Sequence, residues 1–150
     1  MKLVPLVLAA GAAAVLASTT AAAAGSGPSC NLASPKAVKS ALGITVGSPS
    51  ATKNATVTVC QFTTAPGLLV RFQTNETAAL FAFGRKSFAK HGEPTKTVTG
   101  LGTAAYSSTF AGGKSNTIVV LKNRTELLIT AVGEPLAKLE ALAKLILPSM

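Results

Sequence analysis

The sequence predicts an α+β domain in which a mostly antiparallel, twisted sheet is covered by flanking helices. Three observations lead to this prediction. Segments with strand-like alternation follow one another as hairpins, a few segments with helical periodicity separate them, and no strand–helix–strand repeat occurs that would build a parallel sheet. The expected order of elements is α-β-β-α-β-β-β-β-α. The length of 150 residues suits one domain.

The first 24 residues are expected to be a secretory signal peptide and not part of the fold. Lys2 precedes an apolar run over residues 3–17, and residues 21–24 are four alanines that suit a cleavage site. An uncleaved membrane anchor is the rival interpretation, but a spanning helix needs about 20 apolar residues. We therefore expect cleavage after Ala24, with Ala22 and Ala23 as near equivalents, and a secreted, extracytoplasmic protein.

The predicted mature chain consists of a flexible lead, residues 25–29, and a single domain, residues 30–150. Its two cysteines, Cys30 and Cys60, are expected to form a disulfide, because cysteines of exported proteins are usually paired. Two separate buried thiols are the alternative. Acylation of Cys30, which would make the protein lipid-anchored, is a further alternative, although the preceding residues 27–29 make a poor lipobox.

The elements of the first half follow from local pattern. Ser34 and Pro35 begin a helix, because Ser is a good N-cap and Pro fits the first helical position, and Gly43 ends it. Residues 47–54 are predicted to be a loop. Two strands are predicted, over residues 55–63 and 68–73, and the turn at residues 65–67 joins them into a hairpin. Within the first of these strands Val57 and Val59 share one face and Cys60 and Phe62 the other, so either both faces are covered or a bulge shifts the register.

Helical periodicity returns over residues 76–91, where Leu80, Phe81, Gly84 and Phe88 form the expected inward arc. The remaining predicted elements are strands at residues 95–99, 104–110, 117–122 and 126–132, and a helix over residues 135–147. The predicted sheet core consists of Val57, Val70, Ile118, Val120 and Ile129, and the helices are expected to pack Leu80, Phe88, Leu139 and Ile146 against it.

Composition excludes several kinds of site. The chain has no Asp, one His and two Cys, too few ligands for a usual zinc site, and we predict no catalytic residue, cofactor or metal.

The segment FAGGKS at residues 110–115 resembles a phosphate-binding loop, but a strand follows it where that loop needs a helix. A hairpin turn is predicted there. Residues 100–102, GLG, are predicted to form a tight crossing, a point where the backbone passes close to another segment and only small residues fit. His91 is predicted to cap a helix C-terminus.

Several short motifs resemble those of a known group of proteins. They are CNL at residues 30–32, ALG at 41–43, CQF at 60–62 and VTGLGTAAY at 98–106. The chain resembles small exported proteins and lipoproteins of unknown function from high-GC Gram-positive bacteria, which are similar to the extracellular sensor domain of mycobacterial Ser/Thr kinases. The resemblance covers most of residues 30–147 and implies a PsbP-like fold without catalytic residues. The chain departs from the pattern at Thr103, where Asp is common.

The net charge of +9 favours an anionic partner, such as an envelope polymer or lipid headgroups, although solubility explains the charge equally well. Nucleic acid is not an expected partner, because the sequence contains no run of basic residues and has few aromatic residues. Arg71, Lys122 and Arg124, on outward strand positions or in a turn, are the candidate anion contacts. We expect a non-catalytic envelope domain that binds a small or polymeric ligand or partner. A structural or interaction module without a ligand, or an unrecognised hydrolase, is the alternative, and oligomeric state is left open.

Overall fold

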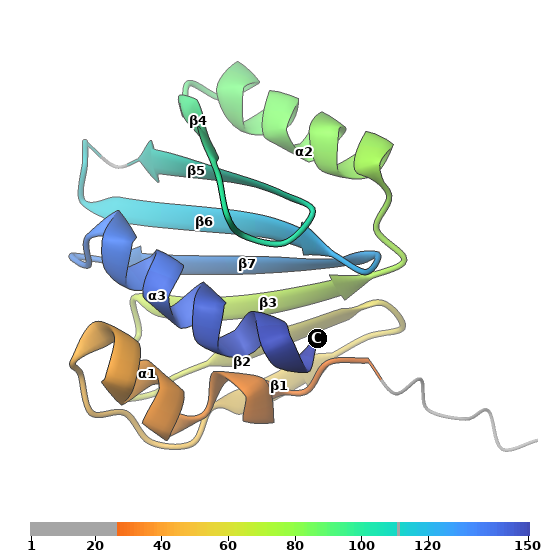
Figure 1. Cartoon of the computed structure of the whole chain (residues 1–150). Coiled ribbons are helices and arrows are strands. Elements are labelled where there is room, and N and C mark those ends of the chain that lie inside the picture. The colour runs from red at the N-terminus through yellow and green to blue at the C-terminus, as the bar shows by residue number, and fades with distance from the viewer. Residues whose placement is uncertain (1–26, 111) are drawn as a thin grey trace, which may run out of the picture.

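A computed structural model of the chain describes residues 27–110 and 112–150, so the predicted signal peptide and its cleavage site lie outside the described residues. The described residues form an α+β domain with a seven-stranded antiparallel sheet (Figure 1), and the predicted fold class is confirmed. The helices are α1 (Pro35–Leu42), α2 (Ala78–Lys90) and α3 (Leu136–Ile146), with short 3-10 helices η1 (Cys30–Ala33) and η2 (Leu147–Ser149). The strands are β1 (Ser50–Lys53), β2 (Val57–Gln61), β3 (Leu68–Thr74), β4 (Thr95–Val98), β5 (Ala104–Phe110), β6 (Ser115–Lys122) and β7 (Thr125–Val132).

The sheet joins two antiparallel meanders. Its strand order is β1-β2-β3-β7-β6-β5-β4, so β1–β3 form one meander, β4–β7 form the other, and α2 connects them along the chain. The two meanders meet where β3 pairs with β7, with Val70 opposite Ile129. This pairing joins segments far apart in the sequence and completes one continuous sheet.

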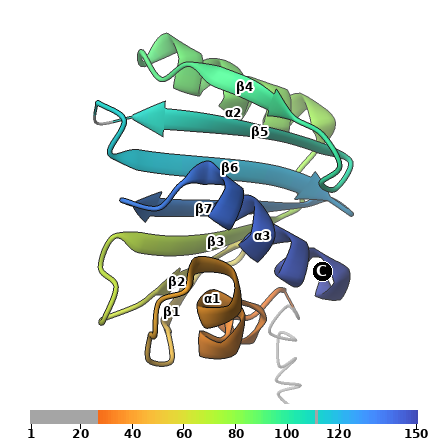
Figure 2. The same cartoon turned by 60° about the vertical axis from the view of Figure 1, so that its left-hand side comes forward.

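Helices lie on both faces of the sheet. α1 and α3 cover one face and α2 lies on the other (Figure 2). The larger core lies beneath α1 and α3, and its fully buried side chains include Val38, Leu42, Val70, Ile118, Val120, Leu127, Ile129, Leu139, Leu142 and Ile146. A smaller core beneath α2 contains Phe81, Tyr106, Val119, Leu121 and Leu128. The rings of Phe81 and Tyr106 lie 5.1 Å apart between their centroids.

Helix caps and the contacts of one lysine stabilise α1 and α3. The Ser34 hydroxyl accepts a hydrogen bond from the Ala37 amide at 3.3 Å, and Gly43 ends α1 in the left-handed conformation with a φ of 76°. In α3, the Lys138 ammonium donates to the Leu42 carbonyl at 2.7 Å and pairs with the Glu134 carboxylate at 2.9 Å. Lys138 therefore ties α3 to the C-terminal end of α1.

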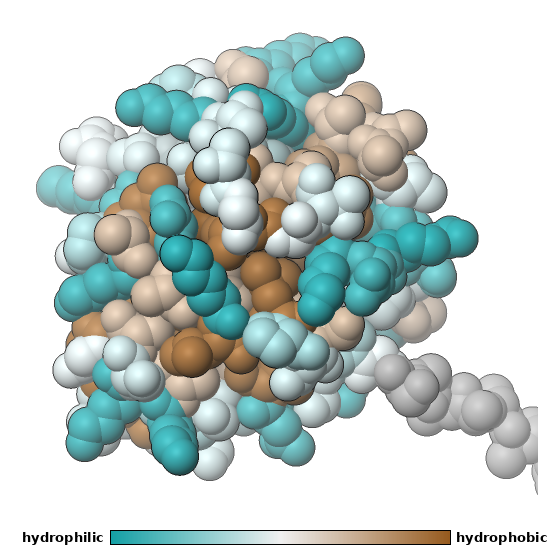
Figure 3. Space-filling view, in the orientation of Figure 1, coloured by the Kyte–Doolittle hydropathy of each residue, from teal (hydrophilic) through white to brown (hydrophobic). Residues whose placement is uncertain are grey.

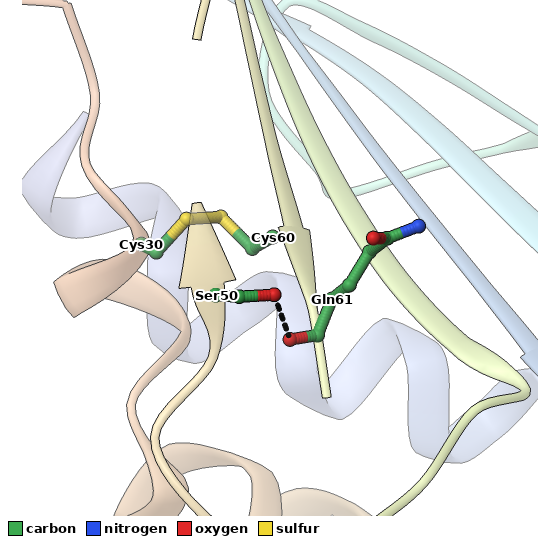
Figure 4. The surroundings of a disulfide bond; sticks show 4 residues. All are labelled: Cys30, Ser50, Cys60 and Gln61. Atoms are coloured by element: carbon green, nitrogen blue, oxygen red, sulfur yellow. Dashed lines mark hydrogen bonds between the residues drawn. A yellow bond between two sulfur atoms is a disulfide. The ribbon is translucent and has the colours of Figure 1, made fainter. Parts of the chain in front are cut away.

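The disulfide prediction is confirmed. Cys30 in η1 and Cys60 in β2 are bonded, both are buried, and the bond links the N-terminal segment to the sheet (Figure 4). Beside it, the Ser50 hydroxyl of β1 donates to the Gln61 carbonyl at 3.4 Å. Because its sulfur is used in this bond, Cys30 has no thiol free for acylation.

Three predictions about the elements are wrong. Residues 50–53, predicted as loop, form β1, because this polar segment pairs with β2. Val57 is half-buried and lies on the α2 side of the sheet, and Cys60 instead points into the larger core. Leu80 is 53% exposed, because α2 turns Phe81 towards the sheet, with Phe88 packed half-buried beside it.

Candidate functional site

The three predicted anion contacts do not form one cluster. Arg71 lies within β3 on the α2 side of the sheet, where its guanidinium donates to the Glu126 carboxylate at 2.5 Å. Lys122, the last residue of β6, has the same strand phase as Val120 and donates to the Leu147 carbonyl on the opposite side. Arg124 is exposed in the turn between β6 and β7. The expectation that all three are free outward side chains is therefore wrong for Arg71 and Lys122.

Arg124 belongs instead to a group of turns gathered at one end of the sheet, where the C-terminus and the start of α2 also lie (Figure 1). These turns are residues 54–56 between β1 and β2, residues 75–77 between β3 and α2, and residues 123–124 between β6 and β7. Backbone hydrogen bonds connect them: the Thr74 amide donates to the Thr56 carbonyl at 2.8 Å, and the Glu76 amide donates to the Arg124 carbonyl at 2.9 Å. We call this group the turn end.

An asparagine begins each of the three turns for a local physical reason. The Asn54 side-chain oxygen accepts from the amides of Thr56 at 3.1 Å and Val57 at 2.8 Å, which closes the turn. Asn75 and Asn123 have positive φ angles of 62° and 48°, a conformation that Asn tolerates better than most residues. Threonine follows two residues later each time; Thr56 and Thr77 lie in their turns, and Thr125 is the first residue of β7.

Two open hollows lie at the turn end. One, of about 320 Å³, is lined by Lys53, Asn54, Thr56, Thr74 and Asn75, among other residues. The other, of about 430 Å³, is lined by residues that include Glu76, Thr77, Thr103, Asn123 and Arg124. Amides, hydroxyls and two exposed cations, Lys53 and Arg124, therefore face solvent together. Such groups can bind both the hydroxyls and the anionic groups of a ligand.

A buried carboxyl also lines one of these hollows. Glu76 is 3% exposed, and its carboxylate accepts a hydrogen bond from the Gln73 amide at 2.9 Å. Burial, and next the nearby charge of Glu126, raise the pKa of Glu76 above its ordinary value of 4.5. Both effects oppose the ionised form. The turn end is therefore not neutralised by an exposed carboxylate of Glu76.

Other features singled out in the sequence have structural roles. Residues 112–114 lie in the hairpin turn between β5 and β6, as predicted, with positive φ at both glycines. His91 is the C-cap of α2, also as predicted. Arg85 of α2 lies over the Tyr106 ring, 5.8 Å from its centroid, and donates to the hydroxyls of Thr95 and Thr97 at 3.1 and 3.0 Å. These contacts attach α2 to β4 and β5.

The comparisons with known proteins give no family. No family model, characterised protein or solved structure matches the chain. The resemblance to small exported proteins of high-GC Gram-positive bacteria thus stays a prediction. Within residues 27–110 and 112–150, no three His, Cys, Asp or Glu residues are grouped as metal ligands. Among the same residues, no helix is both long and apolar enough to cross a membrane.

Sequence reasoning identified Arg124 and missed its neighbours at the turn end, Lys53, Asn54, Asn75 and Asn123. A usable signal was present, because the pattern Asn-x-Thr occurs three times, at residues 54–56, 75–77 and 123–125. Each occurrence marks an end of a strand or helix. That all three lie at the same end of the sheet depends on the pairing of β3 with β7.

Proposed function

We propose that the mature chain is a secreted, non-catalytic domain of the cell envelope that binds an anionic polymer at the turn end. The distribution of charge supports this proposal. Among the described residues, all nine exposed charged side chains are Lys or Arg, whereas the five glutamates are buried or half-buried. A surface of one sign attracts polymers of the opposite sign, and solubility alone does not require the carboxylates to be withdrawn from it.

The turn end is the part of this surface best suited to a polymer. Lys53 and Arg124 provide positive charges for phosphate or carboxylate groups. The side-chain amides of Asn75 and Asn123 can donate to and accept from hydroxyls, and Asn54, whose oxygen is already bonded to two backbone amides, can donate. Asn75 lies in the turn between the two hollows. A chain of repeating anionic units can therefore contact both hollows at once.

The surroundings of Glu76 favour binding over catalysis. A hydrolase that used Glu together with Ser or Lys would need a buried Glu with a raised pKa next to that Ser or Lys. Glu76 is buried and its pKa is raised, but its hydrogen-bond partner is the Gln73 amide. An amide side chain is neither a nucleophile nor a base, so this pair does not match that catalytic arrangement.

The test measures binding of the mature chain to soluble polyphosphate and polyglutamate by titration calorimetry at low and at physiological ionic strength. We expect salt-sensitive binding that weakens about tenfold in the Lys53→Gln/Arg124→Gln variant, since two charge-assisted contacts are lost. The matched control is Lys39→Gln/Lys114→Gln, which removes two exposed charges outside the turn end. Comparison of the two polymers distinguishes phosphate from carboxylate recognition.

Two outcomes would contradict the proposal. If neither polymer binds at low ionic strength, where surface attraction is strongest, the basic surface serves solubility only. If both double variants weaken binding equally, the attraction depends on net charge, and the turn end is not the site.

A further inference from the structure

The outer face of α2 carries two large apolar side chains that are exposed to solvent. Phe83 is 71% exposed and Leu80 is 53% exposed. They lie three residues apart on the helix, beside the exposed alanines Ala79 and Ala82. Single exposed apolar residues are common on protein surfaces. Two large ones together on the outer side of one helix form a continuous apolar strip, and the space-filling view shows apolar residues over the N-terminal half of α2 (Figure 3).

The same helix is basic in its C-terminal half. Its sequence, AALFAFGRKSFAK, contains three basic residues and no acidic one. Lys86 and Lys90 are exposed, and their spacing from Phe83, three and seven residues, places them on the same outer side of the helix. We define the α2 face as Ala79, Leu80, Phe83, Lys86 and Lys90. It has an apolar N-terminal half and a cationic C-terminal half.

The position of α2 leaves this face accessible. α2 lies near the β4 edge of the sheet, on the side opposite α1 and α3 (Figures 1 and 2). Phe81 is its buried residue, and Phe88 and Arg85 complete its attachment to Tyr106. A flat surface can therefore approach the helix from outside without displacing any packed side chain.

We propose that the α2 face docks on the surface of an anionic lipid bilayer, with Phe83 and Leu80 entering the headgroup region and Lys86 and Lys90 contacting lipid phosphates. Helices that lie in a membrane interface combine an apolar side with Lys or Arg in this way. Anionic lipids attract basic segments at the membrane surface. This docking is independent of polymer binding at the turn end, because it uses different residues.

Charge also argues against a second copy of the chain as the occupant. Two α2 faces brought together in parallel would place several lysines close to one another. In an antiparallel pair the lysines of each copy would lie beside the apolar half of the other, and in neither arrangement would an exposed carboxylate on the helix compensate them. A bilayer of anionic lipid supplies the missing negative charge and the apolar environment together.

The first experiment measures cosedimentation of the mature chain with vesicles of phosphatidylglycerol and phosphatidylcholine, compared with vesicles of phosphatidylcholine alone. We expect binding to the anionic vesicles, weakened about tenfold in Leu80→Ala/Phe83→Ala through lost apolar burial. Lys86→Gln/Lys90→Gln should also weaken it. The matched control for the first variant is Val132→Ala/Leu145→Ala, which shortens two exposed apolar side chains outside α2 and should bind as the wild type does.

A second experiment does not depend on loss of binding. The chain contains no Trp, so Phe83→Trp introduces a single fluorescent reporter in the α2 face. Its emission should shift to shorter wavelength with anionic vesicles, because the indole leaves water. Leu145→Trp, on α3, should show no shift. Thermal melts of all variants establish that they are folded.

Three outcomes would overturn the proposal. One is the absence of binding to anionic vesicles at low ionic strength. Another is unchanged binding by Leu80→Ala/Phe83→Ala together with no shift in Phe83→Trp, which would make the attraction purely electrostatic. The third is a concentration-dependent dimer in sedimentation velocity that Leu80→Ala/Phe83→Ala abolishes, which would make a second copy the occupant. Polymer binding at the turn end can survive each of these results.

Discussion

Arg71 shows how a contact between distant strands changes the role of one residue. From the sequence, it occupies a strand position that alternates with apolar neighbours, so it is expected to be outward and free. In the structure, Arg71 is paired across β3 and β7 with Leu128 and bonds diagonally to Glu126 at 2.5 Å. The Glu126 side chain is only 7% exposed. The guanidinium thus balances a buried carboxylate 55 residues away in the chain.

Arg71→Gln should therefore lower the free energy of unfolding by about 1–3 kcal/mol, because the buried carboxylate loses its cation. Arg124→Gln should change it by less than about 0.5 kcal/mol, since the Arg124 side chain is exposed and has no ion pair among the described residues. Urea unfolding of the two variants and the wild type gives the comparison. Adding Glu126→Gln to Arg71→Gln should recover part of the loss, as a double-mutant cycle for a direct pair requires. Equal stability of the two single variants would show that the pair contributes nothing.

At the scale of elements, local signals in the sequence were sufficient where they were strong. The predicted strand at residues 104–110 and the helix that begins at Pro35 and ends before Gly43 have the bounds observed for β5 and α1. β1 was missed because its sequence, SATK, has no apolar periodicity, and its four residues are exposed. It forms a strand because it pairs with β2. The exposure of Leu80 was missed for a related reason: helical spacing defines an apolar arc but not its rotation against the sheet.

The loop at residues 99–103 supports the prediction of a tight crossing and permits a test. Gly102 has a φ of 55°, and a Cβ atom there would lie 2.7 Å from the Val120 side chain and collide with the Leu121 carbonyl. The neighbouring Thr103 amide donates to that carbonyl at 2.7 Å. Gly100 has a φ of 79°, but a Cβ atom would meet nothing within 4 Å.

The two glycines therefore form a matched pair. Gly100→Ala should cost about 1–2 kcal/mol, the strain of a left-handed alanine, whereas Gly102→Ala should cost more because backbone must also move. Thermal and urea unfolding of both variants measure the difference. If Gly102→Ala is no more destabilising than Gly100→Ala, the loop has room to shift away from β6, and the crossing is not tight.

At the scale of the molecule, the fold class and the hairpins were predicted from the sequence, but the order of the strands in the sheet was not. Each meander is built from local pairs, but the sheet exists as one unit because β3 pairs with β7. The same pairing brings the turn at residues 75–77 to the turn at residues 123–124 and creates the turn end. Arg124 could therefore be named from the sequence as a turn cation, while its neighbours could not.

The disulfide is the covalent link that ties the N-terminal segment to this sheet. It joins η1 to β2 with a separation of 30 residues, and the chain-entropy estimate for such a loop is roughly 3–4 kcal/mol. A small domain has a total stability of about 5–15 kcal/mol, so the bond contributes a substantial part of it. The Cys30→Ala/Cys60→Ala variant should accordingly lose a few kcal/mol of unfolding free energy while keeping the strand content of the wild type.

Thiol titration and mass measurement of the exported protein check the pairing that underlies this prediction. We expect no free thiol under denaturing conditions without reductant, and a Cys30 peptide that is linked to the Cys60 peptide and carries no lipid. A reductant should lower the midpoint of urea unfolding of the wild type and leave that of Cys30→Ala/Cys60→Ala unchanged. Two titratable thiols per chain, or an acylated Cys30, would show that the N-terminal segment is held to the sheet by packing alone.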